Sequence, residues 1–231
     1  MTIIMYAKLR WASLRWRAVL PLGAGALLLF MLPASASTAP SSSTTCVGTL
    51  PPGTYHSLVV PAGQTCDLGV GPVRVRAGVR VGPGATFMLG FELGPATGTI
   101  NGGLVADHAA QVQVHNARIA GGVRIREGSG PFGCAQPFGP VCFTDLEDNS
   151  ISGGAIIDGY NGFFLGFIRN HVNGSVVISN NTQTLDQLDL GSNVINGSLT
   201  CAGNNPTENT GDSPGPTPDA VTGRNTCHEV A

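Results

Sequence analysis

The chain has 231 residues, with 12 lysines and arginines against 14 aspartates and glutamates, and 33 of its residues are glycine. Four of the cations lie in the first 17 residues, ahead of or at the start of an apolar run over 18–32, and a small-residue site ends at Ala36. This layout predicts an export signal peptide over 1–36. The apolar run is shorter than the about 20 residues that a membrane span needs.

Removal of this leader would leave 195 residues with eight cations, a net charge of −6 and all six cysteines. Neither lysine nor tryptophan would remain. An acidic balance excludes the basic surface of a nucleic-acid binder, so we expect no nucleic-acid partner. We expect a secreted, extracellular protein whose mature chain has no membrane span.

In chain order, the small polar segment 37–45 predicts a flexible leader, 46–203 an ordered body, and 204–231 a Pro-rich C-terminal cap segment. Within the body, aliphatic residues come in short runs that are rich in valine and isoleucine and are broken by glycine and asparagine. Such runs favour strands over helices, which predicts an all-β protein.

One phrase recurs along the body: an aliphatic residue, any residue, glycine, a small residue and another aliphatic. Its copies begin at Ile100, Ile119, Ile151, Val172 and Ile195. The starts are 19, 32, 21 and 23 residues apart, and the long interval indicates an inserted loop at 129–144. A period of about 20 residues predicts a parallel β-helix, a solenoid of about seven coils that share one apolar interior.

Asparagines mark a fixed place in three of these coils. Asn149, Asn170 and Asn193 each stand two residues before the aliphatic that opens the phrase. Asparagine tolerates left-handed turn geometry, and stacked amides form hydrogen-bonded ladders. We therefore predict an asparagine ladder along the solenoid.

The repeated Ile/Val-x-Gly phrase and the endings over 199–206 and 221–227 resemble the right-handed parallel β-helix superfold that pectate lyases and polygalacturonases use. More narrowly, they resemble secreted actinobacterial β-helix proteins of mostly unassigned function. The resemblance implies a right-handed coil and export. It implies no activity, because fold alone does not define function, and the Asn-Thr-Asp, Asp-Asp and Gly-His-Gly groups of polygalacturonases do not occur in this sequence.

Six cysteines in an exported chain indicate disulfides, although they allow several connectivities. Spacing suggests that one pair ties the start of the chain to the first coil, one closes the inserted loop, and one folds the tail over the last coil. These pairs are Cys46–Cys66, Cys134–Cys142 and Cys201–Cys227.

The strand after each repeat glycine gives a register for comparing coils. Its fourth residue is Asp107, Arg126, Asp158 or Ser179 in successive coils, and Arg76 is expected earlier on the same face. One interpretation is an ion-pair ladder. The other is a catalytic pair formed by Asp107 and Asp158, about 9–10 Å apart. An arginine between them would keep both ionised, which disfavours a general acid.

Hard oxygen ligands also gather at Asp145, Glu147 and Asp148, which makes them calcium candidates, with a solvated acidic loop as the alternative. We expect no other cofactor. Three histidines of the body, at 108, 115 and 171, are isolated in sequence.

Arginines alternate with aliphatics in two VRVR-like segments, 73–76 and 123–126, and a further arginine stands at Arg80. Alternation turns the arginines outward. They form either a basic strip for anionic polymers or ordinary solvent-facing positions.

Aromatic residues cluster in and after the inserted loop. They form either a binding surface or a packed cover over the next coil. The binding candidates are Phe132, Phe138, Phe143, Tyr160 and Phe163.

Together these features predict a non-catalytic binding or structural module at the cell envelope, with a polysaccharide or an envelope component as its partner. A polysaccharide lyase or glycoside hydrolase built on the β-helix is the first alternative. A surface protein that self-associates through Phe132 and Phe138 is the second. The sequence defines neither the ligand nor the oligomeric state.

Overall fold

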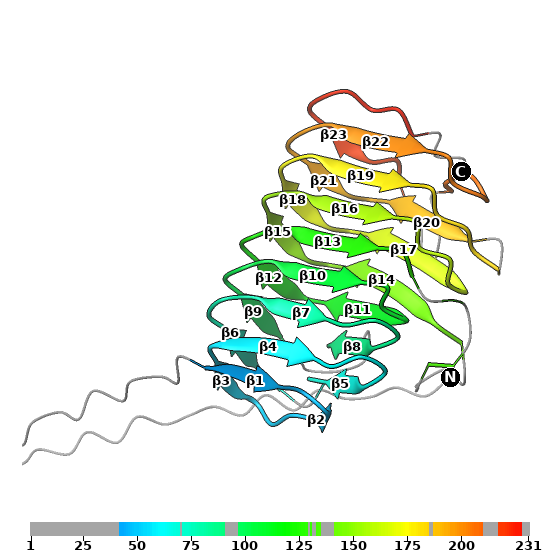
Figure 1. The fold of residues 1–231 in the computed structure, drawn as a ribbon. Coiled ribbons are helices and arrows are strands. Elements are labelled where there is room, and N and C mark those ends of the chain that lie inside the picture. The colour runs from blue at the N-terminus through cyan, green and yellow to red at the C-terminus, as the bar shows by residue number, and fades with distance from the viewer. Residues whose placement is uncertain are drawn as a thin grey trace, which may run out of the picture. The chain divides into compact units, whose positions relative to one another are not determined.

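Short strands return to the same three parallel sheets turn after turn in a computed structural model of the chain (Figure 1). The structure describes residues 42–69, 71–90, 97–128, 130, 133–134, 141–184, 187–209 and 217–227. The signal peptide predicted over 1–36 and the loop residues Phe132 and Phe138 lie outside these residues. Within the described ranges, no helix is both long and apolar enough to cross a membrane.

The three sheets hold eight, seven and eight strands. Sheet A contains β1 (Ser43–Thr45), β4 (Ser57–Val60), β7 (Val79–Val81), β10 (Leu104–Asp107), β13 (Val123–Arg126), β16 (Ala155–Asp158), β19 (Val176–Ser179) and β22 (Leu199–Ala202). Sheet B contains β2 (Gly48–Thr49), β5 (Thr65–Asp67), β8 (Thr86–Leu89), β11 (Gln111–His115), β14 (Phe143–Glu147), β17 (Phe164–Ile168) and β20 (Leu188–Gly191). Sheet C contains β3 (Gly53–Tyr55), β6 (Val73–Val75), β9 (Gly98–Ile100), β12 (Ala117–Ile119), β15 (Ser150–Ser152), β18 (His171–Asn173), β21 (Val194–Ile195) and β23 (Ala220–Val221).

Each coil visits the sheets in the order C, A, B, so that neighbours in a sheet come from successive coils. This is an all-β parallel solenoid of about seven turns, which confirms the predicted fold class. The inserted loop lies between β13 and β14, as the long repeat interval indicates.

Alternate residues of most strands point inward and build one aliphatic core. In β13, for example, Val123 and Ile125 are buried while Arg124 and Arg126 are exposed. Inward-pointing aliphatic residues occupy the same strand position in successive coils, so they stack in rows inside sheet A. Leu104 pairs with Val123, and Val123 pairs with Ala155. Burial of these rows removes apolar surface from water and provides the main stabilisation of the fold.

The repeat phrase forms the corner between sheets C and A. Here the backbones of successive coils approach so closely that a Cβ on Gly102 would lie 1.7 Å from the carbonyl oxygen of Ala77. A Cβ on Gly121 would lie 2.5 Å from the carbonyl carbon of Gly102. Glycine recurs in the phrase because this contact leaves no room for a side chain.

The predicted asparagine ladder occupies the corner between sheets B and C. The Asn170 side-chain oxygen accepts hydrogen bonds from the backbone N–H and the amide of Asn149, each at 3.1 Å. The Asn193 oxygen accepts the same two bonds from Asn170, at 2.8 and 3.1 Å. The ladder ends at Asp219, whose carboxylate accepts from the N–H and the amide of Asn193 at 2.8 and 2.9 Å.

A second, shorter ladder occupies the corner between sheets A and B. The Asn204 oxygen accepts from the backbone N–H and the amide of Asn181, each at 3.0 Å. The Asn204 amide then donates to Glu208. This ladder was not among the predicted features, and both ladders end on a carboxylate of the segment after 204.

Three disulfides join the cysteine pairs that the spacing suggested. Their Cα atoms are 5.3 Å apart in Cys46–Cys66, 5.2 Å in Cys134–Cys142 and 4.8 Å in Cys201–Cys227. The flexible leader predicted over 37–45 is wrong for its last three residues, because Ser43–Thr45 pairs in parallel with β4 as the first strand of sheet A. Within the predicted cap segment, β23 extends sheet C beyond β21.

Replacement of Asn170 by alanine is expected to lower the free energy of unfolding by about 3 kcal/mol or more, because it leaves several buried partners without their hydrogen bonds. Urea denaturation measures the loss. Asn173→Ala is the matched control, since this asparagine lies three residues further on and is exposed; its effect should stay within about 0.5 kcal/mol. Equal losses in the two variants would contradict the structural role of the ladder.

Candidate functional site

The predicted charge ladder stacks in the expected register on sheet A. Asp107 lies opposite Arg126, Arg126 opposite Asp158, and Asp158 opposite Ser179. The placement of Arg76 on this face is wrong, because Arg76 follows β6 in sheet C and the glycine corner separates it from sheet A.

In the candidate catalytic pair, Asp158 is the aspartate whose carboxylate is fixed by two hydrogen bonds. It accepts hydrogen bonds from the Ser179 hydroxyl at 2.7 Å and from the Asn180 amide at 2.8 Å. These two bonds, with a smaller contribution from Arg126, lower the pKa of Asp158 below its usual value. A carboxyl group that is held ionised is poorly suited to donate a proton as a general acid.

The described aromatic candidates contact the protein itself. Tyr160 is completely buried in the core, where its hydroxyl donates to the carbonyl oxygen of Cys142 at 2.9 Å and burial raises its pKa. The rings of Phe143 and Phe163 meet edge to face with centroids 5.7 Å apart, and Phe164 lies 5.8 Å from Phe143. Tyr160 therefore presents no surface to a ligand.

The three calcium candidates fall into two environments. Asp148 sits in a left-handed corner (φ 55°), is exposed, and binds the guanidinium of Arg169 through both carboxylate oxygens at 2.9 and 3.0 Å. Asp145 and Glu147 instead point outward from sheet B and are only 8 and 3% exposed. Arg169 also binds Glu147, so this guanidinium joins the two environments.

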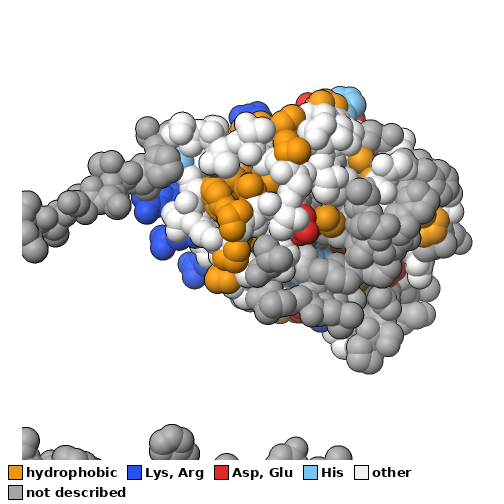
Figure 2. Space-filling view, turned by 90° about the horizontal axis from the view of Figure 1, so that it is seen from below, with side chains coloured by type: hydrophobic (Ala, Val, Ile, Leu, Met, Phe, Trp, Pro, Cys, Tyr) orange, Lys and Arg blue, Asp and Glu red, His pale blue; other side chains and the backbone are white. Residues whose placement is uncertain are grey.

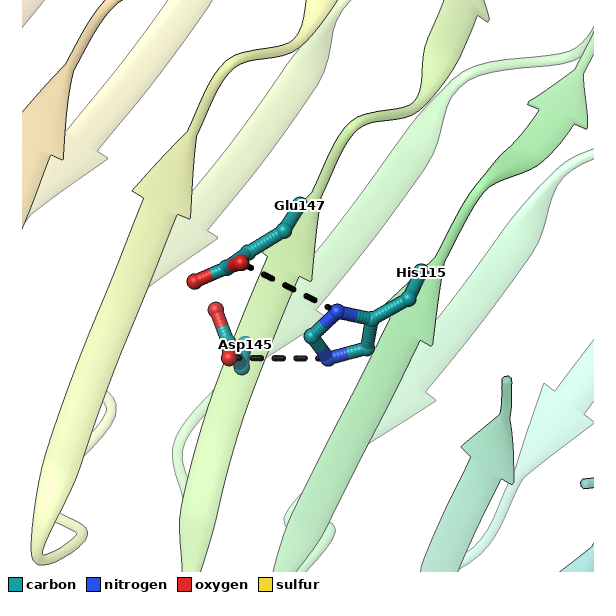
Figure 3. Close-up of side chains that lie close together, drawn as sticks. All are labelled: His115, Asp145 and Glu147. Atoms are coloured by element: carbon teal, nitrogen blue, oxygen red, sulfur yellow. Dashed lines mark ion pairs between the residues drawn. The ribbon is translucent and has the colours of Figure 1, made fainter. Parts of the chain in front are cut away.

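The side chain that meets these buried carboxylates is His115, on the neighbouring strand β11 (Figure 3). Its Nε2 lies 3.5 Å from Oδ2 of Asp145, and its Nδ1 lies 3.9 Å from Oε2 of Glu147. Both carboxylates of β14 thus point toward one imidazole that is 1% exposed. Burial lowers the pKa of His115 to about 4; Asp148 opposes this shift and Arg169 adds to it.

The whole outer face of sheet B is unusual at this level. Outward residues of β10 and β13 are exposed or half-buried, whereas the outward residues of β11 and β14 are nearly all buried although they are polar. We call the following residues the sheet B cluster: Gln111, Gln113, His115, Asp145 and Glu147. In the described part of the chain, its last three members form the one group of histidine, cysteine and acidic side chains close enough to share a metal ion, with one ligand atom from each within 4.8 Å of the others.

Neighbouring residues shape the space around the cluster. Gly166 stands directly beside Asp145 on β17, and a Cβ there would lie 2.4 Å from Oδ1 of Asp145. A side chain at 166 would therefore displace the carboxylate. Gln113 stands directly opposite Asp145 on the other side.

The two carboxylates were predicted as metal ligands from the sequence, but His115 was not. The corner residues indicate that His115 and Glu147 occupy equivalent positions in successive coils. His115 directly precedes the left-handed residue Asn116, and Glu147 directly precedes the left-handed residue Asp148. Counting back from these turns aligns His115 with Glu147. The repeat count hides this match because the inserted loop separates the two strands and the ladder asparagine is replaced by Ala117 in the earlier coil.

The fold and the site define a disulfide-bonded parallel β-solenoid with a buried cluster of one imidazole and acidic and amide side chains on one sheet. No protein family, curated protein or solved structure matches this chain.

Arg169 supports the site from the next coil, which predicts a coupled effect on stability. Replacement of Arg169 by glutamine removes the cation that binds the buried Glu147, and we expect the free energy of unfolding to fall by about 2 kcal/mol. The loss should be smaller than for a fully buried ion pair, because Arg169 is partly exposed. The double variant Arg169→Gln/Glu147→Gln should lose at least about 1 kcal/mol less unfolding free energy than the two single variants lose when their losses are added.

Urea denaturation of the single and double variants measures this coupling, and Arg118→Gln, at an exposed arginine of β12, is the control. Additive losses, or an equal loss in Arg118→Gln, would show that Arg169 does not hold Glu147.

Proposed function

We propose that this protein is an exported, non-catalytic solenoid that acts as a binding or structural module at the cell envelope. Three features support export: the signal-like leader, the six cysteines, and their complete use in three disulfides, since such bonds persist in oxidising compartments. The resemblance to secreted actinobacterial β-helix proteins, with their right-handed coil, belongs to the same proposal.

The observation that carries the binding role is a shallow groove along the outer face of sheet A. Its floor is one in-register row that crosses six coils. The row consists of Val59, Arg80, Val105, Arg124, Ile156 and Val177. Three overlapping hollows follow this row from Ser43 at one end to Val177 at the other. We call it the sheet A groove.

The chemistry of the groove favours an extended anionic polymer. Arg80 and Arg124 are exposed and stand two coils apart, which corresponds to about 9–10 Å along the axis. Val105 lies between them, half-buried, and offers an apolar contact. Guanidinium groups bind carboxylates and phosphates through paired hydrogen bonds. A shallow groove that is open along its length can accommodate an extended polymer chain. We propose an acidic polysaccharide of the envelope as the ligand class.

Seen from below Figure 1, cationic side chains gather along one side of the described surface, and hydrophobic side chains form a patch on this end of the solenoid (Figure 2). Every cation of the described residues is an arginine. This asymmetry supports electrostatic attraction of an anionic polymer to part of the surface, although the mature chain as a whole is acidic.

The double variant Arg80→Ala/Arg124→Ala tests the groove. Co-sedimentation with polygalacturonate as the anionic probe should weaken at least about tenfold, since each charged hydrogen bond contributes about 1.5–3 kcal/mol. Binding by the unchanged protein should also weaken as salt rises. Neutral dextran serves as the polymer control.

The matched protein control is Arg74→Ala/Arg118→Ala. These arginines also stand two coils apart, in register through Thr99, but on sheet C. Equal losses in the two double variants would show non-specific charge attraction and overturn the assignment to the sheet A groove.

The enzyme alternative rests on the register of Asp107 and Asp158, which lie two coils apart on the same face. The same samples distinguish this alternative from binding alone: new chain ends of the polysaccharide are measured with and without calcium. Cleavage that Asp158→Ala abolishes would replace the binding proposal by a lyase or hydrolase.

A further inference from the structure

Two features of the sheet B cluster are unexpected for a solenoid that only needs a stable fold. Its outward side chains are polar but buried, and two of them, Gln111 and Gln113, each have an amide oxygen with no hydrogen-bond partner among the described residues. The faces of sheets A and C show that an outward strand residue of this fold can remain exposed. From these features we propose that the sheet B cluster binds one divalent transition-metal ion of the Zn²⁺ type, which joins β11 to β14.

The spacing of two donors suits such an ion. Nε2 of His115 and Oδ2 of Asp145 are 3.5 Å apart. Two ligands bound to Zn²⁺ at about 2.0–2.1 Å in tetrahedral geometry are separated by about 3.3–3.4 Å. An ion between these two atoms therefore needs little movement of either side chain.

Glu147 occupies the position of a supporting carboxylate. It faces Nδ1, the other nitrogen of the same ring, at 3.9 Å. A carboxylate at this nitrogen favours the tautomer that carries its proton on Nδ1 and its lone pair on Nε2, which is the usual arrangement around metal-bound histidines. Arg169 in turn holds Glu147, so the support extends into the next coil.

Gln113 provides the independent sign of a ligand. It is 1% exposed, it lies on the same side of β11 as His115, and it stands directly opposite Asp145. Its Oε1 is buried and has no hydrogen-bond partner in the part of the chain that the structure describes. An unpaired buried amide oxygen costs about 1–3 kcal/mol, and coordination of a cation would remove this cost. Gly166, which has no side chain, leaves room for the carboxylate of Asp145.

The donor set selects the metal class. Calcium takes oxygen ligands, whereas an imidazole nitrogen together with carboxylate and amide oxygens suits zinc and its neighbours in the first transition row. Because β14 directly follows the inserted loop, an ion held by β11 and β14 would fix the strand that resumes the solenoid after that loop.

The test uses the full chain with its disulfides intact, freed of metal by a chelator. Calorimetric titration with ZnCl₂ should show one ion per chain, and the unfolding temperature should rise with zinc. Co²⁺ in place of zinc should give the visible absorption of a low-symmetry nitrogen and oxygen site. His115→Gln and Asp145→Asn should weaken binding at least about 100-fold, and Glu147→Gln about tenfold.

The matched control is His108→Gln. This exposed imidazole lies 3.2 Å from Asp107 and 2.7 Å from Glu127, so it offers the same donor types at the surface. Zinc binding should be unchanged in His108→Gln. Gly166→Ala provides a variant that keeps every donor, and its methyl group should weaken binding by displacing Asp145.

Three results would overturn the proposal: no bound zinc at micromolar concentrations, binding that is lost in His108→Gln but kept in His115→Gln, or binding of Ca²⁺ in preference to Zn²⁺. If His115→Gln or Asp145→Asn does not fold, the cobalt spectrum of the unchanged protein and the Gly166→Ala titration decide the outcome.

Discussion

The asparagine ladders give the solenoid a direction. Asn149, Asn170, Asn181 and Asn193 each donate a backbone N–H and a side-chain amide to one oxygen in the coil that follows, so each of these asparagines requires an acceptor there. Asn193 and Asn204 come last in their ladders, and the segment after 204 provides Asp219 and Glu208 for them. A carboxylate accepts hydrogen bonds but donates none when ionised, so it ends a ladder without requiring a further partner. The Cys201–Cys227 disulfide holds this segment on the last coil. The tail therefore completes hydrogen bonds that begin several coils earlier.

The same ladder fixes the register on which the candidate site depends. Asn149 accepts from the backbone N–H of Ala117 at 2.9 Å and donates to the carbonyl oxygen of Val114 at 2.8 Å. These bonds bracket His115 on β11. They therefore place the imidazole beside Glu147, which stands only two residues before Asn149. A corner that exists to hold coils together thus also sets the distance between an imidazole and two carboxylates.

Local pattern was sufficient to predict the fold and the charge register, because each depends on residues that recur at nearly constant spacing. The disulfide pairs follow from a different signal, since each joins cysteines that are neighbours in the order of the chain. The glycine phrase marks a corner where a side chain cannot fit, and the asparagines mark a corner where an amide is required. Burial of the sheet B cluster could not be predicted in this way, since Gln111-Val112-Gln113-Val114-His115 reads as a strand with one solvent face. The meeting of His115 with Asp145 depends on register across an insertion. The short ladder through Asn181 and Asn204 spans only two coils, too few to establish a pattern.

The contrast between the outer faces bears on function more directly than the fold does. Corners and core stabilise the solenoid from inside, so its outer faces can differ without loss of the fold. On sheet A, the exposed arginines Arg80 and Arg124 stand in register on either side of Val105. This arrangement suits a polymer that approaches from solvent. Sheet B instead buries amide and acidic groups, which costs free energy unless every group is paired. Arg169 binds Glu147 and Asp148, but the amide oxygen of Gln113 has no hydrogen-bond partner within the described ranges. Since the fold does not require that oxygen to be buried there, a bound cation is the simplest reason for the arrangement of this face.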